Sequence, residues 1–414
     1  ILWITVCIAL CNSRASAEHL VLDADTQINL PSGFDAELLY EVPASQGSWV
    51  AMAFDPKGRL IVSDQDDKGV FRLTLTETEG AGVRVEHLEG FPYLPINWGR
   101  RRVGGALGFL YAFDSLYMSS MKGFYRIRDT DGDDTFDEFT LLKQLGVGYE
   151  HSAHSIIKTE DGQGLYLVTG NHTPLPPGIP SLQPAVWETD SLLQEMNDAM
   201  GHAVGIQPPA GWICRITPDG KDWVMVASGF RNAVDIAINR EGELFTYDSD
   251  LEFDVGTPWY RPTRVNHVTS ASEFGWRPGS AKWPDYFEDS NGAVINIGPG
   301  SPTGISFGHH SNFPAPYQDK LFICDWTFGS IYLIDMEEDG SSYVGTKTEF
   351  LNGQPLNISA MRFGPDGHMY FLVGGRNTDS RLYRIRYVGP PQKGAGKRLV
   401  ANQDLRDLRH SLEV

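Results

Sequence analysis

The sequence predicts an all-β fold, a six-bladed β-propeller of four-stranded antiparallel blades with loop insertions on one face. One observation is composition, because 44 Gly, 25 Pro and 11% aromatic residues favour a turn-rich β protein over a helical one. The other is repetition, since a strand–turn–strand unit occurs six times. A β-sandwich also contains many short strands, but it does not predict this repetition. The length of 414 residues alone would suggest two or three domains. The six repeated units indicate a single propeller domain instead.

The repeated unit is clearest in residues 229–254, to which the other units can be aligned. Alternating apolar residues predict a strand at residues 233–238, residues 239–243 supply a turn, and residues 244–247 form a second apolar strand. The six units are residues 51–64, 107–119, 154–169, 234–248, 303–325 and 358–373. Each unit continues into another strand, at residues 69–75, 123–128, 212–216, 264–268, 330–336 and 381–387.

The connections between strands fall on two faces of such a ring. In an up-and-down blade, the loop entering the first strand and the loop leaving the second strand share a face, which we call the site face. Polar residues concentrate in these loops, and a ring of polar groups around a channel mouth is a common place for a ligand site. The insertions at residues 173–209 and 256–289 leave from the site face and are expected to wall or roof the channel. Residues 33–42 are expected to add a strand that closes the ring with the last blade.

The two ends of the chain differ from the repeats. An apolar run followed by Ala15-Ser16-Ala17 resembles a signal peptide, which predicts a secreted or periplasmic protein. The run is too short to span a bilayer. We therefore expect a signal peptide in residues 1–17, the propeller in residues 18–389, and a linker leading into a helical region in residues 390–414.

The net charge disfavours some classes of binding partner, and the cysteine content bears on whether the chain contains a disulfide. The formal net charge of −19 disfavours binding to nucleic acid or to an anionic membrane surface. Outside the signal-like segment the chain has two cysteines, Cys214 and Cys324, both in predicted strands. We expect small buried apolar residues at these positions, and the sequence leaves a disulfide between them open.

Several motifs resemble the glucose/sorbosone dehydrogenases, six-bladed propellers that use pyrroloquinoline quinone (PQQ) and calcium. Residues 150–171 (EHSAHSIIKTEDGQGLYLVTGN) look like the blade that carries the family's catalytic histidine. Residues 229–250 (GFRNAVDIAINREGELFTYDSD) are similar to its Arg-Asn blade. The resemblance covers roughly residues 33–389 and is closer still to a bacterial group of secreted, membrane-bound-dehydrogenase-like, haem-binding proteins. In that group a cytochrome c domain follows the propeller, which implies a haem domain as electron acceptor.

This resemblance implies a dehydrogenase that oxidises a sugar or a related alcohol or aldehyde. It maps the general base onto His151, because an imidazole with a pKa near neutral suits removal of a hydroxyl proton as hydride leaves carbon. Glu150 stands where the family has an acidic residue and is expected to hold the imidazole tautomer. His154 is the weaker candidate for the base. The alternative for His151 is a rim histidine that only hydrogen-bonds loop backbone.

The resemblance also maps cofactor contacts onto Arg231 and Asn232. A guanidinium pairs well with a quinone oxygen or a carboxylate and stabilises developing negative charge. The alternative is a structural Arg231 paired with Asp235 or Asp248. In the family, calcium lies beside the cofactor on backbone carbonyls of the loop that corresponds here to residues 248–250, and the carboxylates of Asp248 and Asp250 would strengthen a hard-cation site.

The chain departs from the family at three cationic positions. Thr327 stands where the family has a cofactor-binding lysine, and residues 352–357 (NGQPLN) replace a pair of arginines. Each lost charge-assisted bond weakens the binding of a tricarboxylate quinone by roughly 1.5–3 kcal/mol. The remaining site-face candidates for cofactor binding are Asp325, Trp326, Thr327 and Arg376, of which Arg376 supplies a partly compensating cation. A second function class therefore stays open, a non-catalytic propeller that binds a carbohydrate or a protein partner.

A second calcium candidate lies in residues 129–138 (DTDGDDTFDE). Asp129, Asp131, Asp133 and Asp137 place oxygen ligands at alternating positions around a glycine turn, as in a short calcium loop. The segment lacks the twelve-residue EF-hand spacing, and a solvated acidic hairpin is the alternative.

Overall fold

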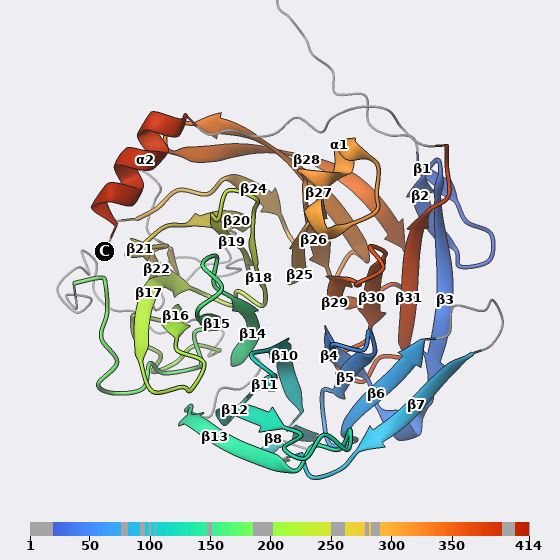
Figure 1. The fold of residues 1–414 in the computed structure, drawn as a ribbon. Helices are drawn as coiled ribbons and strands as arrows, with labels where there is room; N and C mark the ends of the chain where they lie inside the picture. Colours follow the sequence, from blue (N-terminus) through green and yellow to red (C-terminus); the bar gives the residue numbers. More distant parts are fainter. Residues whose placement is uncertain are drawn as a thin grey trace, which may run out of the picture.

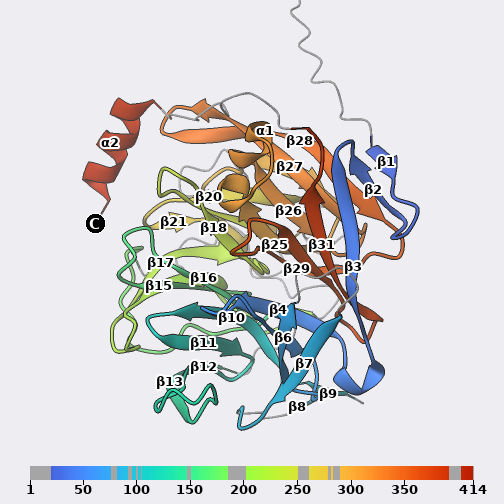
Figure 2. The same ribbon diagram turned by 45° about the vertical axis from the view of Figure 1, so that its right-hand side comes forward.

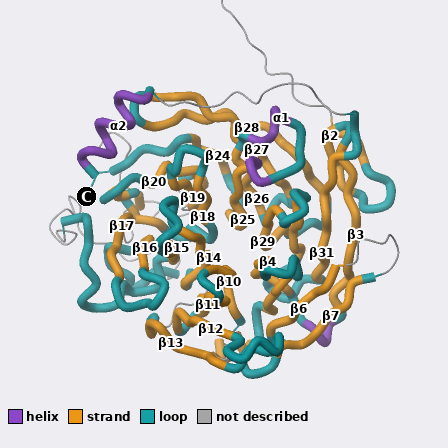
Figure 3. The backbone as a smooth tube through the Cα atoms, viewed as in Figure 1, coloured by secondary structure: helices purple, strands orange, loops and turns teal. Residues whose placement is uncertain are grey.

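The computed structural model describes residues 20–75, 82–91, 96–98, 101–103, 105–146, 151–184, 202–249, 261–277, 281–282, 290–390 and 402–413. Strands dominate this part of the chain (Figure 3), and six sheets, each built on four antiparallel strands, form a ring (Figure 1). The predicted six-bladed β-propeller is confirmed. The expected signal peptide lies outside the described residues. No helix in the described ranges is long and apolar enough to cross a membrane.

In blades 1 to 5 the four main strands run outward from the first strand in chain order. Blade 1 contains β4 (Trp49–Phe54), β5 (Leu60–Asp64), β6 (Val70–Leu75) and β7 (Val83–Leu88). Blade 2 contains β10 (Ala106–Ala112), β11 (Ser115–Ser120), β12 (Gly123–Arg128) and β13 (Glu138–Gln144). Blade 3 contains β14 (Ala153–Lys158), β15 (Leu165–Thr169), β16 (Gly211–Ile216) and β17 (Trp223–Phe230), with β21 (Ser272–Glu273) added in parallel.

The other three blades follow the same plan. Blade 4 contains β18 (Ile236–Ile238), β19 (Leu244–Asp248), β20 (Thr263–Val268) and β24 (Ile295–Gly298). Blade 5 contains β25 (Pro302–Phe307), β26 (Leu321–Asp325), β27 (Ser330–Asp339) and β28 (Ser342–Gly353), extended by β2 (Ile28–Pro31) and β1 (Leu20–Leu22). Blade 6 contains β29 (Ile358–Phe363), β30 (Met369–Val373), β31 (Ser380–Tyr387) and β3 (Phe34–Val42).

Within the described ranges, few elements lie outside the blades. Two small hairpins are formed by β8 (Ile96–Trp98) with β9 (Arg101–Val103) and by β22 (Trp276–Arg277) with β23 (Ala281–Lys282). The short helices are η1 (Ala44–Gln46), η3 (Gly308–His310) and α1 (Ala315–Gln318), and the longer helix α2 spans Gln403–Leu412.

The ring is closed by strands from opposite ends of the propeller. Strand β3 pairs antiparallel with β31, from Phe34 opposite Tyr387 to Val42 opposite Ser380. Figure 2 shows the two strands side by side, although more than three hundred residues of chain separate them. The expected closure by residues 33–42 is therefore confirmed. Backbone pairing between β3 and β31 therefore joins the two ends of the propeller.

Apolar residues fill the spaces between neighbouring blades. Phe322 of blade 5 and Phe371 of blade 6 belong to one fully buried cluster, and Phe245 of blade 4 packs against Phe307 of blade 5. Cys214 and Cys324 are both free and buried within such clusters, in β16 and β26. The disulfide that the sequence left open is not formed.

One predicted strand is shorter than its sequence pattern indicates. The alternation from residue 233 predicts a strand at residues 233–238, but β18 begins at Ile236. The Asp235 carboxylate accepts the backbone N–H groups of Ile236, at 3.0 Å, and of Ile305 in the next blade, at 3.1 Å. It also forms an ion pair with Arg362 at 2.5 Å. Asp235 therefore links blades 4, 5 and 6, and regular pairing starts only after it.

Helix α2 lies against the hairpin of blade 4, at the end opposite the site face. Arg409 and His410 of the helix both contact Oε1 of Glu243, and His267 contacts Oε2 at 3.0 Å. Burial raises the pKa of Glu243, but the bonds from His267 and Arg409 outweigh it and lower this pKa to about 2. Glu243 is thus an ionised buried carboxylate that connects α2 to the propeller.

Candidate active site

The loops predicted to share a face do meet. The loop leaving β15 hydrogen-bonds the loop entering β14, through Gly170 N–H to Ser152 O at 2.8 Å and His172 N–H to His151 O at 3.1 Å. The same leaving loop reaches the next blade, because Asn171 N–H donates to Arg231 O at 2.8 Å. The entering loops of blades 3 and 4 therefore form one rigid corner of the site face.

His151 lies buried in this corner. Its Nδ1 contacts Oδ1 of Asn171 at 2.6 Å, and its ring lies 4.5 Å from the ring of His172 and 4.6 Å from that of His202, measured between centroids. Burial, the nearby Arg231 guanidinium and the two other imidazoles lower the pKa of His151 well below 6.5. A neutral His151 that donates Nδ1–H to Asn171 keeps its lone pair on Nε2. Glu150, the expected tautomer-holding residue, lies outside the described residues.

His154, the weaker histidine candidate, faces a different partner. Its Nε2 contacts Oδ1 of Asn232 at 2.9 Å, and burial lowers its pKa to about 4. Asn232, a predicted cofactor contact, is thereby held between His154 and the isolated β-bridge that it forms with Gly170. Asn232 therefore lies at the same corner as His151, but its amide oxygen already contacts His154.

Arg231 and Asp248 also lie at this corner, but they interact through the backbone of Arg231. The Asp248 carboxylate is fully buried and accepts the N–H groups of Arg231 at 3.1 Å, Asn232 at 2.8 Å and Ser249 at 2.9 Å, all on Oδ1. The partly buried guanidinium of Arg231 donates from Nη1 to Ser249 Oγ at 3.1 Å. Asp235, the other expected partner of Arg231, pairs with Arg362 instead. Asp250 lies outside the described residues.

Asp248 belongs to a repeated feature, which we call the strand-end aspartates. Asp64, Asp248 and Asp325 each end the second strand of a blade, and each is buried. Their carboxylates accept N–H groups both from the loop that enters the first strand and from the loop that follows the aspartate. Burial raises the pKa of both Asp64 and Asp325. These carboxylates fix the loops of the site face in position.

The remaining predicted cofactor residues form a separate group on blades 5 and 6. Asp325 Oδ1 accepts the N–H of Thr327 at 2.9 Å, and the Thr327 hydroxyl donates to Ser301 Oγ at 2.8 Å. The indole of Trp326 donates to Gly374 O at 2.6 Å, and the Arg376 guanidinium lies 5.4 Å from its ring centroid. The structure thus brings Asp325, Trp326, Thr327 and Arg376 together.

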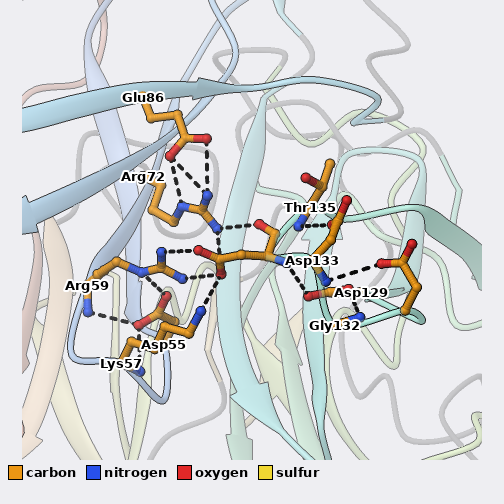
Figure 4. A network of polar contacts seen from close by, with 11 residues as sticks. Asp55, Lys57, Arg59, Arg72, Glu86, Asp129, Gly132, Asp133 and Thr135 are labelled. Carbon is orange, nitrogen blue, oxygen red and sulfur yellow. Dashed lines mark hydrogen bonds and ion pairs between the residues drawn. The ribbon is translucent and has the colours of Figure 1, made fainter.

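The acidic hairpin before β13 contains two kinds of carboxylate (Figure 4). Asp129, Asp131 and Asp133 each offer an oxygen within 4.8 Å of the others, as a calcium loop requires. Asp137 is not in this group, because its two oxygens accept from the N–H and the hydroxyl of Thr130. The neighbouring Asp134 is held by three cations of blade 1, Lys57, Arg59 and Arg72. The bond from Arg59 is the largest of the effects that lower the pKa of Asp134.

Sequence reasoning missed three side chains of the corner. Asn171 and His172 follow the repeated unit at residues 154–169, in a loop of the site face, but were not predicted as partners of His151. His202 lies within the insertion at residues 173–209. The available signal was the alternation of loops between the two faces of a blade. Residues 171–172 follow the second strand of blade 3 and His151 precedes its first strand, so both loops lie on the site face. His202 follows from no spacing rule. It comes from the described end of the insertion, which brings its ring centroid within 4.6 Å of that of His151.

No protein-family profile matches the sequence, and no curated protein matches it either. Solved structures do match. The PQQ-bound aldose sugar dehydrogenase of Streptomyces coelicolor gives a TM-score of 0.60 at 17% identity, over 86% of this chain and 99% of its own. The apo form of the soluble aldose sugar dehydrogenase of Escherichia coli gives 0.57 at 16% identity, over 86% and 99%. A calcium structure of Trichoderma reesei carbohydrate-active enzyme family AA12 gives 0.61 at 12% identity, over 90% and 98%. At these identities the similarity establishes a shared propeller fold.

Proposed function

We propose that this propeller is a sugar-oxidising oxidoreductase with its active site at the corner of His151. The observation that carries the proposal is the neutral, buried His151, held by Asn171 beside the guanidinium of Arg231. The sugar dehydrogenases that share the fold support the substrate class. The proposed substrate is a sugar or a related alcohol or aldehyde.

The residues of the corner suit the removal of a proton from a substrate hydroxyl. Nε2 of His151 takes the hydroxyl proton while hydride leaves the adjacent carbon, which converts the C–OH group into a carbonyl. The hydrogen bond from Nδ1–H to Asn171 orients the ring and stabilises the imidazolium that forms. Arg231 lies close enough to influence the pKa of His151 and is positioned to stabilise negative charge on the substrate oxygen.

Bound PQQ would accept the hydride as a two-electron acceptor. Arg231 and Arg376 would provide guanidinium groups for its carboxylates, and these two cations suit a carboxylate-bearing quinone. Asn232, Trp326 and Thr327 would add further contacts, and Asp325 would act by holding the N–H groups of Thr327 and Phe328 in place. Calcium is proposed on the loop of Asp248 and Asp250. Since the Asp248 carboxylate is engaged by backbone amides, its carbonyl group is the better candidate ligand. We further propose secretion to the periplasm or the exterior, and electron transfer to a cytochrome c or haem domain.

A reconstitution assay tests the proposal. The purified chain is incubated with calcium and PQQ, and reduction of an artificial dye is measured over a panel of aldoses. His151→Ala should abolish dye reduction with little change in melting temperature, whereas His154→Ala should do much less. No reduction with any sugar would refute the proposal. Equal loss in both variants together with unfolding would assign His151 a structural role.

A second candidate function is a non-catalytic propeller that binds a carbohydrate or a protein. The observation in its favour is the scarcity of cations, since Thr327 hydrogen-bonds Ser301 and residues 352–357 contain no arginine. Calorimetric binding of sugars without PQQ, in a protein that reduces no dye, would support this function.

A further inference from the structure

Three histidines from separate segments converge at the corner of the site face. His151 precedes β14, His172 follows β15, and His202 lies in the insertion between β15 and β16. Their ring centroids lie 4.5, 4.6 and 4.7 Å apart, and each residue offers a nitrogen within 4.8 Å of the others. His151 and His172 are buried, and His202 is the most exposed of the three. Three imidazoles at this separation repel one another if they are protonated.

The backbone around the first two histidines is held closely. Thr173 N–H donates to Gly170 O at 3.1 Å, and the Trp212 indole donates to Thr173 O at 2.8 Å. A Cβ atom on Gly170 would lie 2.7 Å from Cβ of His151, so glycine is needed where the two loops approach. The loops therefore present His151 and His172 from a rigid frame, as a preformed ligand site requires.

His151 has the environment of a metal-ligating imidazole. A histidine that binds a metal through one nitrogen generally donates its other N–H to a carbonyl or carboxylate oxygen, which fixes the tautomer. Asn171 Oδ1 supplies this acceptor at 2.6 Å from Nδ1.

We propose that His151, His172 and His202 form a binding site for a divalent transition metal of the zinc type. Three imidazole ligands suit zinc and its neighbours, whereas calcium and magnesium prefer oxygen ligands. In a tetrahedral site with Zn–N bonds of about 2.0–2.1 Å the nitrogens stand about 3.3 Å apart, so a small inward rotation of the rings completes the site. The fourth position is left for water or an exogenous ligand on the side of the exposed His202.

The nearby Arg231 gives this site a preference for its fourth ligand. A guanidinium beside a dication favours an anion such as hydroxide or a carboxylate over a neutral fourth donor. The proposal goes beyond the sugar-oxidising function and does not depend on it. Because the metal takes the Nε2 lone pair of His151, the metal-loaded chain cannot use His151 as a base, and added zinc should inhibit any dye reduction.

Metal binding is tested directly on the whole chain. The protein is freed of metal with a chelator and titrated with Zn²⁺ by calorimetry, and Co²⁺ is used as a spectroscopic probe of tetrahedral nitrogen coordination. We expect one tight site per chain. His172→Ala and His202→Ala should each weaken binding by more than tenfold, and Asn171→Ala should weaken it by about 10–100-fold.

His310→Ala is the matched control, because His309 and His310 form a second histidine pair with ring centroids 4.0 Å apart. This variant should retain the tight site. Because His202 is the most exposed of the three histidines, His202→Ala should disturb the fold least, and its melting temperature is measured alongside. Unchanged affinity in folded His202→Ala, or loss of the site in His310→Ala, would overturn the proposal. Since the readout is binding, failure here leaves the sugar-oxidising function standing.

Discussion

Replacing Asp248 tests whether its carboxylate serves to hold backbone N–H groups or to bind a metal. In Asp248→Ala the backbone N–H groups of Arg231, Asn232 and Ser249 lose their common acceptor in a fully buried setting. An unsatisfied buried donor costs about 1–3 kcal/mol, so three donors cost at least about 3 kcal/mol. In Asp248→Asn the amide oxygen can occupy the position of Oδ1, which accepts all three bonds. Its NH2 group replaces Oδ2, which lies 3.2 Å from the Arg231 nitrogen, so this variant loses that weaker contact and the charge contribution, at a cost of about 1–2 kcal/mol.

The assay is urea denaturation followed by circular dichroism, with and without calcium. Asp248→Ala should lower the midpoint clearly more than Asp248→Asn does. Asp325 provides the matched pair, because its Oδ1 also accepts three backbone N–H groups. If Asp248→Asn lowers the midpoint as much as Asp248→Ala, and both variants lose a calcium response that the natural chain shows, then Asp248 is a calcium ligand and our reasoning is wrong.

Two further predictions concern carboxylates away from the corner. Glu243 has its pKa lowered to about 2 from 4.5, so it stabilises the fold fully above about pH 4.5 and loses that contribution as pH falls towards 2. The difference corresponds to about 3 kcal/mol at neutral pH, and the stability gap between the natural chain and Glu243→Gln, measured by urea denaturation, should close over this range. If Asp131 and Asp133 bind calcium, a chelator should lower the melting temperature of the natural chain but not that of Asp131→Asn with Asp133→Asn, while Asp137→Asn should keep the response. A melting temperature indifferent to chelator would leave the hairpin as a solvated acidic loop.

The fold was predictable because periodicity and repetition are local properties of the sequence. Six aligned strand–turn–strand units need only alternating apolar residues and turn residues, and the closing strand follows from an extra strand before the first unit. Because the loop before the first strand of each blade lies on the site face, His151 and Arg231 could be assigned to the same face. The early part of β18 was overestimated because Asp235 makes contacts with two other blades, which its own sequence neighbourhood does not reveal.

The roles of individual carboxylates and histidines were less predictable. The sequence shows that Asp248 is acidic and follows a strand, but not that backbone amides turn towards it. The same holds for Asp134, whose partners Arg59 and Arg72 belong to another blade. His202 reaches His151 only through the path of an insertion, so no periodicity brings the two together. Tertiary contacts decide these cases.

The measurement that tests the proposed function most directly is a deuterium isotope effect on dye reduction. The chain, supplied with calcium and PQQ, is assayed with an active aldose and with the same sugar deuterated at the oxidised carbon. If His151 removes the hydroxyl proton as hydride leaves, the natural chain should show a primary isotope effect, and His151→Ala should be slower by roughly 10²–10⁴-fold while folded. An unchanged rate in folded His151→Ala, or no sugar-dependent reduction in the natural chain, would contradict the function proposed here.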